Sequence, residues 1–260
     1  MDVRGAADGD LPAIARIALA NDDGDGADPR YVAHLRAHGR FLVAAADGAA
    51  AGYCAVRCLD GLTLLCDLFV DPARHGGGAG RRLLDAVFEA DGERSTFASR
   101  DPRAMSLYVR YGMVPRWPLL YLEGPPLAGT PAERVPAAVA AAAERELNGR
   151  DRSADYAFWA ATPGATGLLV HDGDTVAAAG IAGPDRLFHL ATADGADPAA
   201  TLRAALATFT AARVRLCLPG PHPALPLLLD ARWRIEDADQ HMSSRPDLLS
   251  PADVLSASLA

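Results

Sequence analysis

The sequence has 260 residues, half of them hydrophobic, which is enough for one large core or two smaller ones. The formal net charge is −8, and all 25 basic residues are Arg because the chain contains no Lys. This balance argues against a general nucleic-acid binder, which needs a basic face to displace counterions from phosphates.

The first half alternates between strand and helix patterns. Asp10 stands before a segment with helical apolar spacing, so we expect it to cap a helix. The turn residues Asp47-Gly48 predict a hairpin, and the nearly continuous apolar run from Leu62 to Val70 predicts a central strand covered on both faces. The expected strands are 2–4, 41–46, 50–58, 62–70, 95–99 and 114–122, and the expected helices are 10–20, 29–37, 81–90 and 102–111.

Residues 124–136 contain four prolines and are interpreted as a linker between two domains, 1–123 and 137–260. The second half repeats the order of elements, and residues 102–113 match residues 222–233 at a constant offset of 120. We therefore expect two tandem copies of one fold. The expected helices of the second half are 137–147, 198–212 and 223–231, and its expected strands are 167–171, 175–182, 186–192, 214–218 and 234–241.

Several classes of protein are disfavoured by what the sequence lacks. No run of about 18 apolar residues occurs, so we expect no transmembrane helix and no membrane partner. The N-terminus lacks a basic region followed by an apolar stretch, which makes a cytoplasmic location the default expectation. The four cysteines form no C-x-x-C pair, so neither a disulfide framework nor a metal site is expected.

The strongest chemical signal is the run DPARHGGGAGRRLL, residues 71–84, directly after the predicted buried strand. Helix N-termini present unpaired N–H groups that bind phosphates, and glycines let the backbone approach such a ligand closely. The spacing does not fit a Rossmann motif, and the absence of Lys excludes a Walker motif. A flexible glycine-rich connection with no ligand is the alternative interpretation.

This run resembles the coenzyme loop of the GNAT acyltransferase superfamily, which reads [Q/R]-x-x-G-x-[G/A]. Residues 75–80 fit that spacing, with His75 in place of the usual Gln or Arg. The preceding LFVDP and the following RRLL are similar to the strand end and the helix start of the family.

A second motif supports the resemblance. Residues 101–113 are similar to the family's N-x-x-A-x-x-L-Y-x-x-x-G-[F/M], with Asp101 where Asn is more usual. The two motifs occur in the family's order, and the resemblance covers roughly residues 1–122. It implies an α/β (α+β) fold of two tandem GNAT-like domains, each a mixed, mostly antiparallel sheet flanked by helices.

The resemblance also implies an acetyl-CoA cosubstrate and assigns residues to it. The N–H groups from His75 to Arg81 would hold the pyrophosphate, and the backbone of Phe69 and Val70 would pair with the pantetheine arm. Arg74 would supply the side-chain contact that His75 gives up. The residues implied to bind the coenzyme are Leu68, Phe69, Val70, Arg74, His75, Gly76, Gly77, Gly78, Ala79, Gly80, Arg81 and Asp101.

The reaction implied is attack of a neutral amine on the thioester carbonyl, which needs a base for the amine and an acid for the thiolate. Tyr108 stands where many members carry the acid, and the alternative is an aromatic side chain that only packs. Asp67 is the only charged residue in its predicted strand, and burial would raise the pKa of such a carboxylate toward that of a useful base. An ion pair with an Arg, and a water relay without a dedicated base, are the alternatives for Asp67.

Cys66 and the loop 21–28 are two further features for which we favour a structural role over a catalytic one. Cys66 has no identifiable His partner, so we expect it to pack rather than to form an acyl-enzyme. The loop from Asn21 to Asp28 falls where this fold often builds its acceptor pocket, and its four Asp would attract a cationic amine. Its composition is equally that of an ordinary solvated loop, which we favour.

The second half has lost the features that carry the chemistry. Thr192 to Pro198 stands in place of the glycine loop with two Asp, which would repel a pyrophosphate, and Leu228 corresponds to Tyr108. We therefore expect a degenerate domain and a monomer that is an intramolecular pseudo-dimer. The expected partner is a small-molecule or peptide amine. A non-catalytic acyl-CoA-binding sensor or scaffold is the alternative function.

Overall fold

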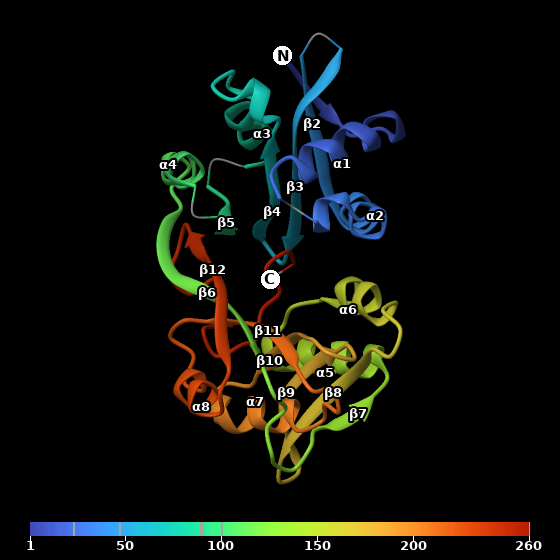
Figure 1. Cartoon of the computed structure of the whole chain (residues 1–260), viewed down its shortest axis with the longest axis vertical. Helices are drawn as coiled ribbons and strands as arrows, with labels where there is room; N and C mark the ends of the chain where they lie inside the picture. The colour runs from blue at the N-terminus through green and yellow to red at the C-terminus, as the bar shows by residue number, and fades with distance from the viewer. Residues whose placement is uncertain (23, 47, 89–90, 100, 260) are drawn as a thin grey trace. The chain divides into compact units, whose positions relative to one another are not determined.

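The computed structural model describes the chain from Met1 to Leu259 except residues 23, 47, 89–90 and 100, and the side chain of Asp25 also lies outside the description. The chain divides into two compact units (Figure 1). The first unit comprises residues 1–97, 102–114 and 243–248, and the second comprises residues 98–101, 115–242 and 249–260. Both units combine helices with sheets, as the sequence predicted.

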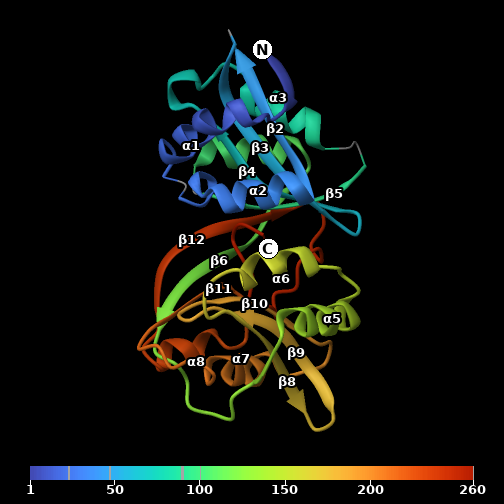
Figure 2. The same ribbon diagram turned by 90° about the vertical axis from the view of Figure 1, so that its right-hand side faces the viewer.

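The first unit is a sheet in the order β1-β2-β3-β4-β5, antiparallel except for the parallel pair β4 and β5. Figures 1 and 2 show α1 and α2 on one side of this sheet and α3 on the other. The strands are β1 Asp2–Gly5, β2 Gly39–Ala46, β3 Ala49–Leu59, β4 Leu62–Val70 and β5 Glu93–Ala98. The α-helices are α1 Leu11–Leu19, α2 Pro29–His38, α3 Ala79–Val87 and α4 Pro102–Arg110, and the 3-10 helices are η1 Asp8–Asp10, η2 Asp25–Ala27 and η3 Pro72–Arg74.

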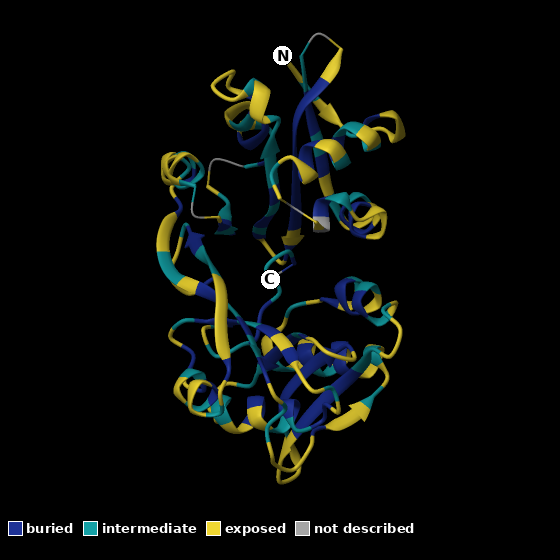
Figure 3. Ribbon diagram, viewed as in Figure 1, coloured by how far each residue is buried: buried dark blue, intermediate teal, exposed yellow. Residues whose placement is uncertain are grey.

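The first unit's core lies where α1, α2 and α3 cover the sheet, and Figure 3 shows β3 as one of its most buried strands. Ile14, Ile17, Tyr53, Leu83 and Leu84 are at most 1 % exposed. The helices therefore contribute apolar side chains from both sides, and β3 is the most buried strand between them. The sequence had predicted this place for the next strand, residues 62–70.

The predicted cap of the first helix is wrong in its detail. Asp10 does lie at the N-terminus of α1, but its carboxylate makes no capping bond to that helix. It accepts instead from the N–H of Ala7 at 2.8 Å and from both terminal nitrogens of Arg4 at 2.6 and 2.8 Å. A short 3-10 turn precedes the helix, so the carboxylate faces back toward β1.

A segment near the end of the chain returns to the first unit. The N–H of Ser244 donates to the carbonyl of Arg94 in β5 at 2.9 Å, and the N–H of Arg94 donates to Ser244 Oγ at 3.0 Å. Sequence pattern did not predict this contact, which joins residues 150 positions apart.

The second unit contains the sheet β10-β9-β8-β7 and, separately, β6 between β11 and β12. The strands are β6 Val114–Gly124, β7 Glu133–Val135, β8 Thr166–Asp172, β9 Thr175–Ala182, β10 Leu187–Thr192, β11 Val214–Pro219 and β12 Arg234–Ser243. The helices are α5 Ala137–Asn148, α6 Ser153–Ala160, α7 Pro198–Leu206 and α8 Leu225–Asp230. Buried residues concentrate in β9 (Figure 3), and the core includes Leu202, Leu228, Trp233 and Val254.

Two segments take roles that the sequence pattern did not predict. β6 was expected to close the first domain, but it pairs antiparallel with β11 of the second unit from Leu119↔Pro219 to Gly124↔Val214. The expected linker contains the short strand β7, which pairs with β8. None of the described helices is long and apolar enough to cross a membrane.

The internal sequence repeat corresponds to the same backbone structure in the two units. After α4, the N–H of Met113 donates to Tyr108 O at 3.2 Å, and after α8 the N–H of Trp233 donates to Leu228 O at 3.0 Å. The residues just before the two donors, Gly112 and Arg232, both have positive φ, at 78° and 69°. The two helices therefore end in the same way, 120 residues apart.

Candidate active site

The site is built on the C-terminal end of β4, where the strand loses one of its neighbours. β4 pairs with β3 along its length, up to Gly52↔Val70. Its parallel pairing with β5 runs only from Leu62↔Glu93 to Leu65↔Thr96. The expectation of a strand covered on both faces therefore holds for the buried Leu64 and Leu65, whereas Leu68 to Val70 are half-buried.

β4 has a β-bulge, in its pairing with β3, at the point where it parts from β5. Val56 pairs with Leu65 and Ala55 pairs with Asp67, so Cys66 is the extra residue of β4. Bulges bend a strand and occur often next to active sites, because they re-aim side chains and end pairing. The backbone of residues 67–70 is thereby left at an edge on which an extended ligand can add as a strand.

The loop after β4 is fixed by local hydrogen bonds. Asp71 caps the 3-10 helix η3 by accepting from the N–H of Ala73 at 3.0 Å. Arg16 of α1 donates to the other carboxylate oxygen at 2.9 Å, and this bond to the guanidinium lowers the pKa of Asp71. The start of the loop is therefore held to α1 by a carboxylate that stays ionised.

The glycines then shape the N-terminus of α3. Gly76 and Gly78 both have φ of +80°, a conformation that residues with a Cβ rarely adopt, and Gly78 is the N-cap. The first bond into the helix runs from the N–H of Arg82 to Gly78 O at 3.1 Å. The N–H groups of Ala79, Gly80 and Arg81 precede that bond, so the helix itself offers them no acceptor.

Gly80 lets α3 and α4 lie close to the end of β4. A Cβ at this position would stand 3.5 Å from a methyl of Leu107, 3.7 Å from a methyl of Val70 and 4.0 Å from a methyl of Leu68. The predicted loop, the predicted strand end and the helix of the second motif therefore meet at one place.

His75 joins these elements through its ring. Its Nε2 lies 3.1 Å from the carbonyl oxygen of Val70, and its Nδ1 lies 3.1 Å from a terminal nitrogen of Arg103 in α4. Because Arg can only donate, Nδ1 accepts and Nε2 carries the proton that it donates to Val70. Arg103 is a functional candidate that sequence reasoning passed over, although it lies inside the second motif.

The remaining predicted coenzyme residues occupy different surroundings. Arg74 is half-buried, and Arg81 is exposed with its guanidinium 3.9 Å from Asp85. The exposed Arg82 adds a second positive charge at the start of α3. Asp101 is half-buried and lies directly before α4, in the short stretch 98–101 that belongs to the second unit.

Asp67 lies inside the first unit with a partner that the sequence did not reveal. It is 5 % exposed, and the hydroxyl of Tyr31, in α2, donates to its Oδ1 at 3.1 Å. The two residues are 36 positions apart, and no motif connects them. Burial and the neighbouring Asp67 raise the pKa of Cys54, so that thiol stays protonated. Cys66 Sγ lies 3.7 Å from Leu64 O.

The two tyrosines of the second motif differ in their surroundings. Tyr108 of α4 is 6 % exposed and is the buried residue of that helix. Tyr111 follows the helix, and its hydroxyl donates to Asp85 at 2.6 Å and lies 3.0 Å from Arg81 O. Burial and the bond to Asp85 raise the pKa of Tyr111 to about 12. Tyr111 therefore links α3 to the end of α4.

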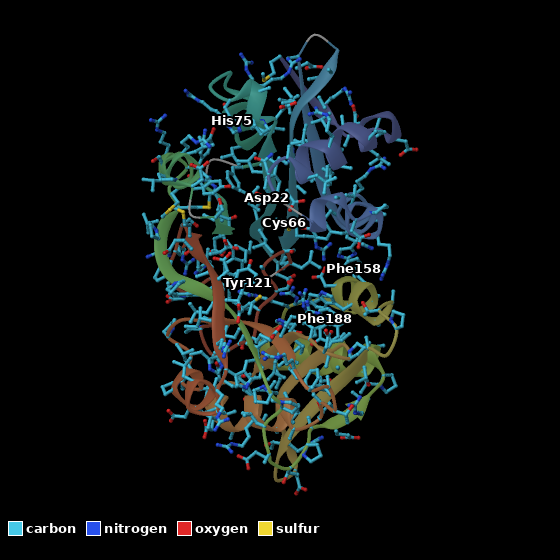
Figure 4. All side chains as sticks on the ribbon, in the orientation of Figure 1. Asp22, Cys66, His75, Tyr121, Phe158 and Phe188 are labelled. Atoms are coloured by element: carbon cyan, nitrogen blue, oxygen red, sulfur yellow. The ribbon has the colours of Figure 1, made fainter. Side chains whose placement is uncertain are left out.

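The loop expected at the acceptor pocket is tied to the same strand end. Asn21 Nδ2 donates to Ile17 O at 2.8 Å and to Val70 O at 3.3 Å. Asp28 caps α2 by accepting from the N–H of Arg30 at 2.8 Å, so it serves the helix. Figure 4 labels Asp22, which is exposed, together with Cys66 and His75. Asp23 lies outside the described residues.

The geometry is that of a strand edge leading into a helix N-terminus with open N–H groups. A sequence profile described as an acetyltransferase (GNAT) domain matches residues 37–114, which span β2 to α4. A search among curated proteins found no match.

Solved structures share the fold of the whole chain. A proposed acetyltransferase from Pyrococcus horikoshii is 16% identical with a TM-score of 0.76, and the match covers 100% of this chain and 95% of that one. A tandem GNAT protein from the clavulanic acid biosynthesis pathway is 13% identical with a TM-score of 0.62, covering 96% and 99%. A GCN5-related N-acetyltransferase from Anabaena variabilis is 16% identical with a TM-score of 0.64, covering 93% and 72%. At such identities the likeness concerns the fold.

Proposed function

We propose that this chain, whose residues 37–114 match the GNAT acetyltransferase family, transfers an acetyl group from acetyl-CoA to a primary amine. The observation that carries the proposal is the junction of β4 and α3, where a one-sided strand edge runs into a glycine-shaped helix N-terminus. These two parts suit the two halves of the coenzyme, a pantetheine arm with amide groups and a pyrophosphate.

The residues present fit such a cosubstrate. A Cβ at Gly76 or Gly78 would meet no atom within 4 Å, so the space next to the loop backbone is open to a ligand. The N–H groups of Ala79, Gly80 and Arg81 would hold the pyrophosphate, with the positive end of the α3 dipole behind them. Leu68, Phe69 and Val70 would pair with the pantetheine arm through their backbone.

Charged side chains would complete the anion site. His75, Gly77 and Arg74 shape the loop, and Arg81 and Arg103 bring positive charge from α3 and α4. Asp101, directly before α4, can only accept hydrogen bonds while ionised, so its role would be to accept one from the coenzyme. Since the ring of His75 bonds to Val70 and Arg103, we infer that its substitution for Gln or Arg serves to hold Arg103.

The proposed reaction is direct transfer in a ternary complex. The amine nitrogen attacks the thioester carbonyl carbon, the carbon–sulfur bond breaks, and the thiolate sulfur takes the phenol proton of Tyr108. Asp67 takes the proton that the amine releases, and Tyr31 holds its carboxylate through the bond at 3.1 Å. The phenolate of Tyr108 then recovers a proton from water and Asp67 releases its proton to water, so both groups return to their starting states.

The proposed acceptor is a cationic amine. The net charge of −8 favours a cationic amine through electrostatic steering. The loop 21–28, with its Asp residues, is held next to the end of β4 by the bond from Asn21 to the carbonyl of Val70. We further propose that the protein works as a monomer. Light scattering on the purified chain tests this point.

The test of the function is thiol release from acetyl-CoA with a panel of amines. We expect amine-dependent release by the wild type and a loss of roughly 10²-fold or more in kcat for Tyr108→Phe, because an acid in place contributes about that factor. Tyr111→Phe is the matched control, since it removes a phenol from the same segment whose hydroxyl is bound to Asp85. Its kcat should stay within a few-fold of the wild type.

Coenzyme binding measured by calorimetry separates the alternatives. Acetyl-CoA that binds without turnover for any amine would favour the non-catalytic sensor or scaffold. Equal losses in the two Tyr variants would remove Tyr108 from the role of acid.

A further inference from the structure

The second unit repeats the strand geometry of the candidate site. β10 pairs with β9 through a bulge, since Leu187 pairs with Ala182 while His189 pairs with Ile181, which makes Phe188 the extra residue. In β4 the extra residue is Cys66. Phe188 therefore corresponds to Cys66, and His189 to Asp67.

β10 and β11 also part at the position where β4 and β5 part in the first unit. β10 meets β11 at the parallel bridge Arg186↔Arg215, one residue before the start of β10. By the bulge alignment Arg186 corresponds to Leu64, whose partner in β5 is Ser95. Beyond this bridge the second unit has a slot between β10 and β11, equivalent to the edge that we propose for pantetheine.

The chain's own C-terminal segment lies in that slot. The N–H of Val254 donates to Leu190 O at 2.9 Å, and the N–H of Leu190 donates to Val254 O at 3.0 Å. On the other side, the N–H of Leu255 donates to Cys217 O at 3.2 Å. The segment therefore pairs with both strands at once, with one residue to each.

Side chains fix the segment further. Asp253 accepts from the N–H of Thr192 through Oδ1 at 2.9 Å, and Thr192 Oγ1 donates to Ala252 O at 3.1 Å. His222 Nε2 lies 3.0 Å from the same carbonyl of Ala252. Val254 and Leu255 are 0 % and 2 % exposed, so these two residues belong to the core.

The helix N-terminus of the second unit is also satisfied from within. Asp197 is the N-cap of α7 and accepts from the N–H groups of Ala199 and Ala200 at 2.9 and 3.3 Å. The corresponding N-cap of α3 is Gly78, which has no side chain to offer. A carboxylate of the chain therefore stands where a phosphate would bind at α3.

We propose that the second unit is a peptide-binding copy of the coenzyme site, whose ligand is the chain's own segment 252–255. In this assignment, which rests on the function proposed for the first unit, the segment replaces the pantetheine arm and the Asp197 carboxylate replaces the pyrophosphate. The chain then binds one acyl-CoA, in the first unit. The pairing also points to Leu68 and Phe97, the counterparts of Leu190 and Cys217, as the backbone positions that face the slot of the first unit.

Hydrogen exchange of the full-length chain tests this assignment. The amides of Val254 and Leu255 should exchange roughly 10³-fold or more slowly than those of an unstructured peptide, because a paired, buried amide exchanges only when the structure opens. Saturating acetyl-CoA should not speed them up. His222→Ala should accelerate exchange at 252–255, whereas His171→Ala, a change at an exposed His on β8, should not.

Three results decide the matter. Rapid exchange of the two amides in the wild type would overturn the proposal. Acceleration by acetyl-CoA together with two bound equivalents per chain would also overturn it, because the coenzyme would then displace the segment. If acetyl-CoA does not bind at all, the proposed function fails, while slow exchange and its response to His222→Ala still support the assignment of the segment.

Discussion

Gly78→Ala is the sharpest perturbation of the proposed anion site. Gly78 has φ of +80° and ψ of 9° as the N-cap of α3, and an added Cβ would meet no atom within 4 Å. The cost of the change is therefore backbone strain without a steric clash. A residue with a Cβ in the left-handed region costs about 1–2 kcal/mol.

The strain is expected to appear in coenzyme affinity. If the substituted alanine leaves the left-handed region, the N–H groups of the first turn of α3 no longer converge, and binding must restore the strained conformation. About 1–2 kcal/mol then corresponds to a Kd for acetyl-CoA that rises roughly 5- to 30-fold. Calorimetric titration of the two proteins measures this change directly.

Gly195→Ala is the matched control. Gly195 has φ of +82°, an added Cβ there would also meet no atom within 4 Å, and it lies in the equivalent loop between β10 and α7. The control substitution should lower the free energy of unfolding by a similar amount and leave the Kd unchanged. An unchanged Kd in Gly78→Ala, or an equal loss in both variants, would refute the argument for the α3 site.

Three further changes test other parts of the structure. Arg103→Ala should raise the Kd for acetyl-CoA by roughly 2- to 5-fold at low salt and by less at high salt, because salt screens an exposed charge. Titrations of both proteins at two ionic strengths measure this change. A change in Kd that does not depend on salt would count against a role of Arg103 in anion binding. Burial lowers the pKa of His222 to about 4, below the value of 6.5 for an unfolded His. Between pH 6.5 and 4 the unfolded chain therefore binds a proton at His222 that the folded chain does not bind, so the free energy of unfolding falls as the pH is lowered through this window. The difference in free energy of unfolding between the wild type and His222→Gln should therefore shrink over that window, by at most about 1.4 kcal/mol per pH unit, and a constant difference in denaturation curves would contradict it. Gly124→Ala should destabilise the second unit by about 1–3 kcal/mol or more, because the new Cβ would lie 2.2 Å from Cγ of the buried Trp233. An unchanged denaturation midpoint would contradict this prediction, because it would mean that the backbone of β6 can shift at little cost.

Local pattern was a good guide where a structure depends on neighbours in the chain. The apolar run 62–70 is a strand, the glycine loop leads into a helix, and the second motif is helical, all as predicted. The repeat at an offset of 120 predicted a second copy of the fold, and its two segments do end their helices with the same bond and a positive φ.

Strand partners were not readable in the same way. β6 has the composition expected of a strand, but nothing in it shows that it pairs with β11. The residues that hold the proposed catalytic groups were hidden for the same reason, since Tyr31 reaches Asp67 across 36 positions and His75 reaches Arg103 across 28. Such contacts depend on which helices and strands pack together, and the periodicity of apolar side chains along one element does not predict its packing partners.

The sequence by itself determined the kind of fold and the place of the glycine loop before α3, because both rest on short-range rules of apolar spacing and glycine conformation. Only the tertiary structure decided that β4 bulges at Cys66 and parts from β5, and that segment 252–255 fills the equivalent slot of the second unit. Backbone N–H and C=O groups at a buried strand edge must find partners, and any segment of the chain can supply them. The choice of the C-terminal segment therefore belongs to the assembled fold.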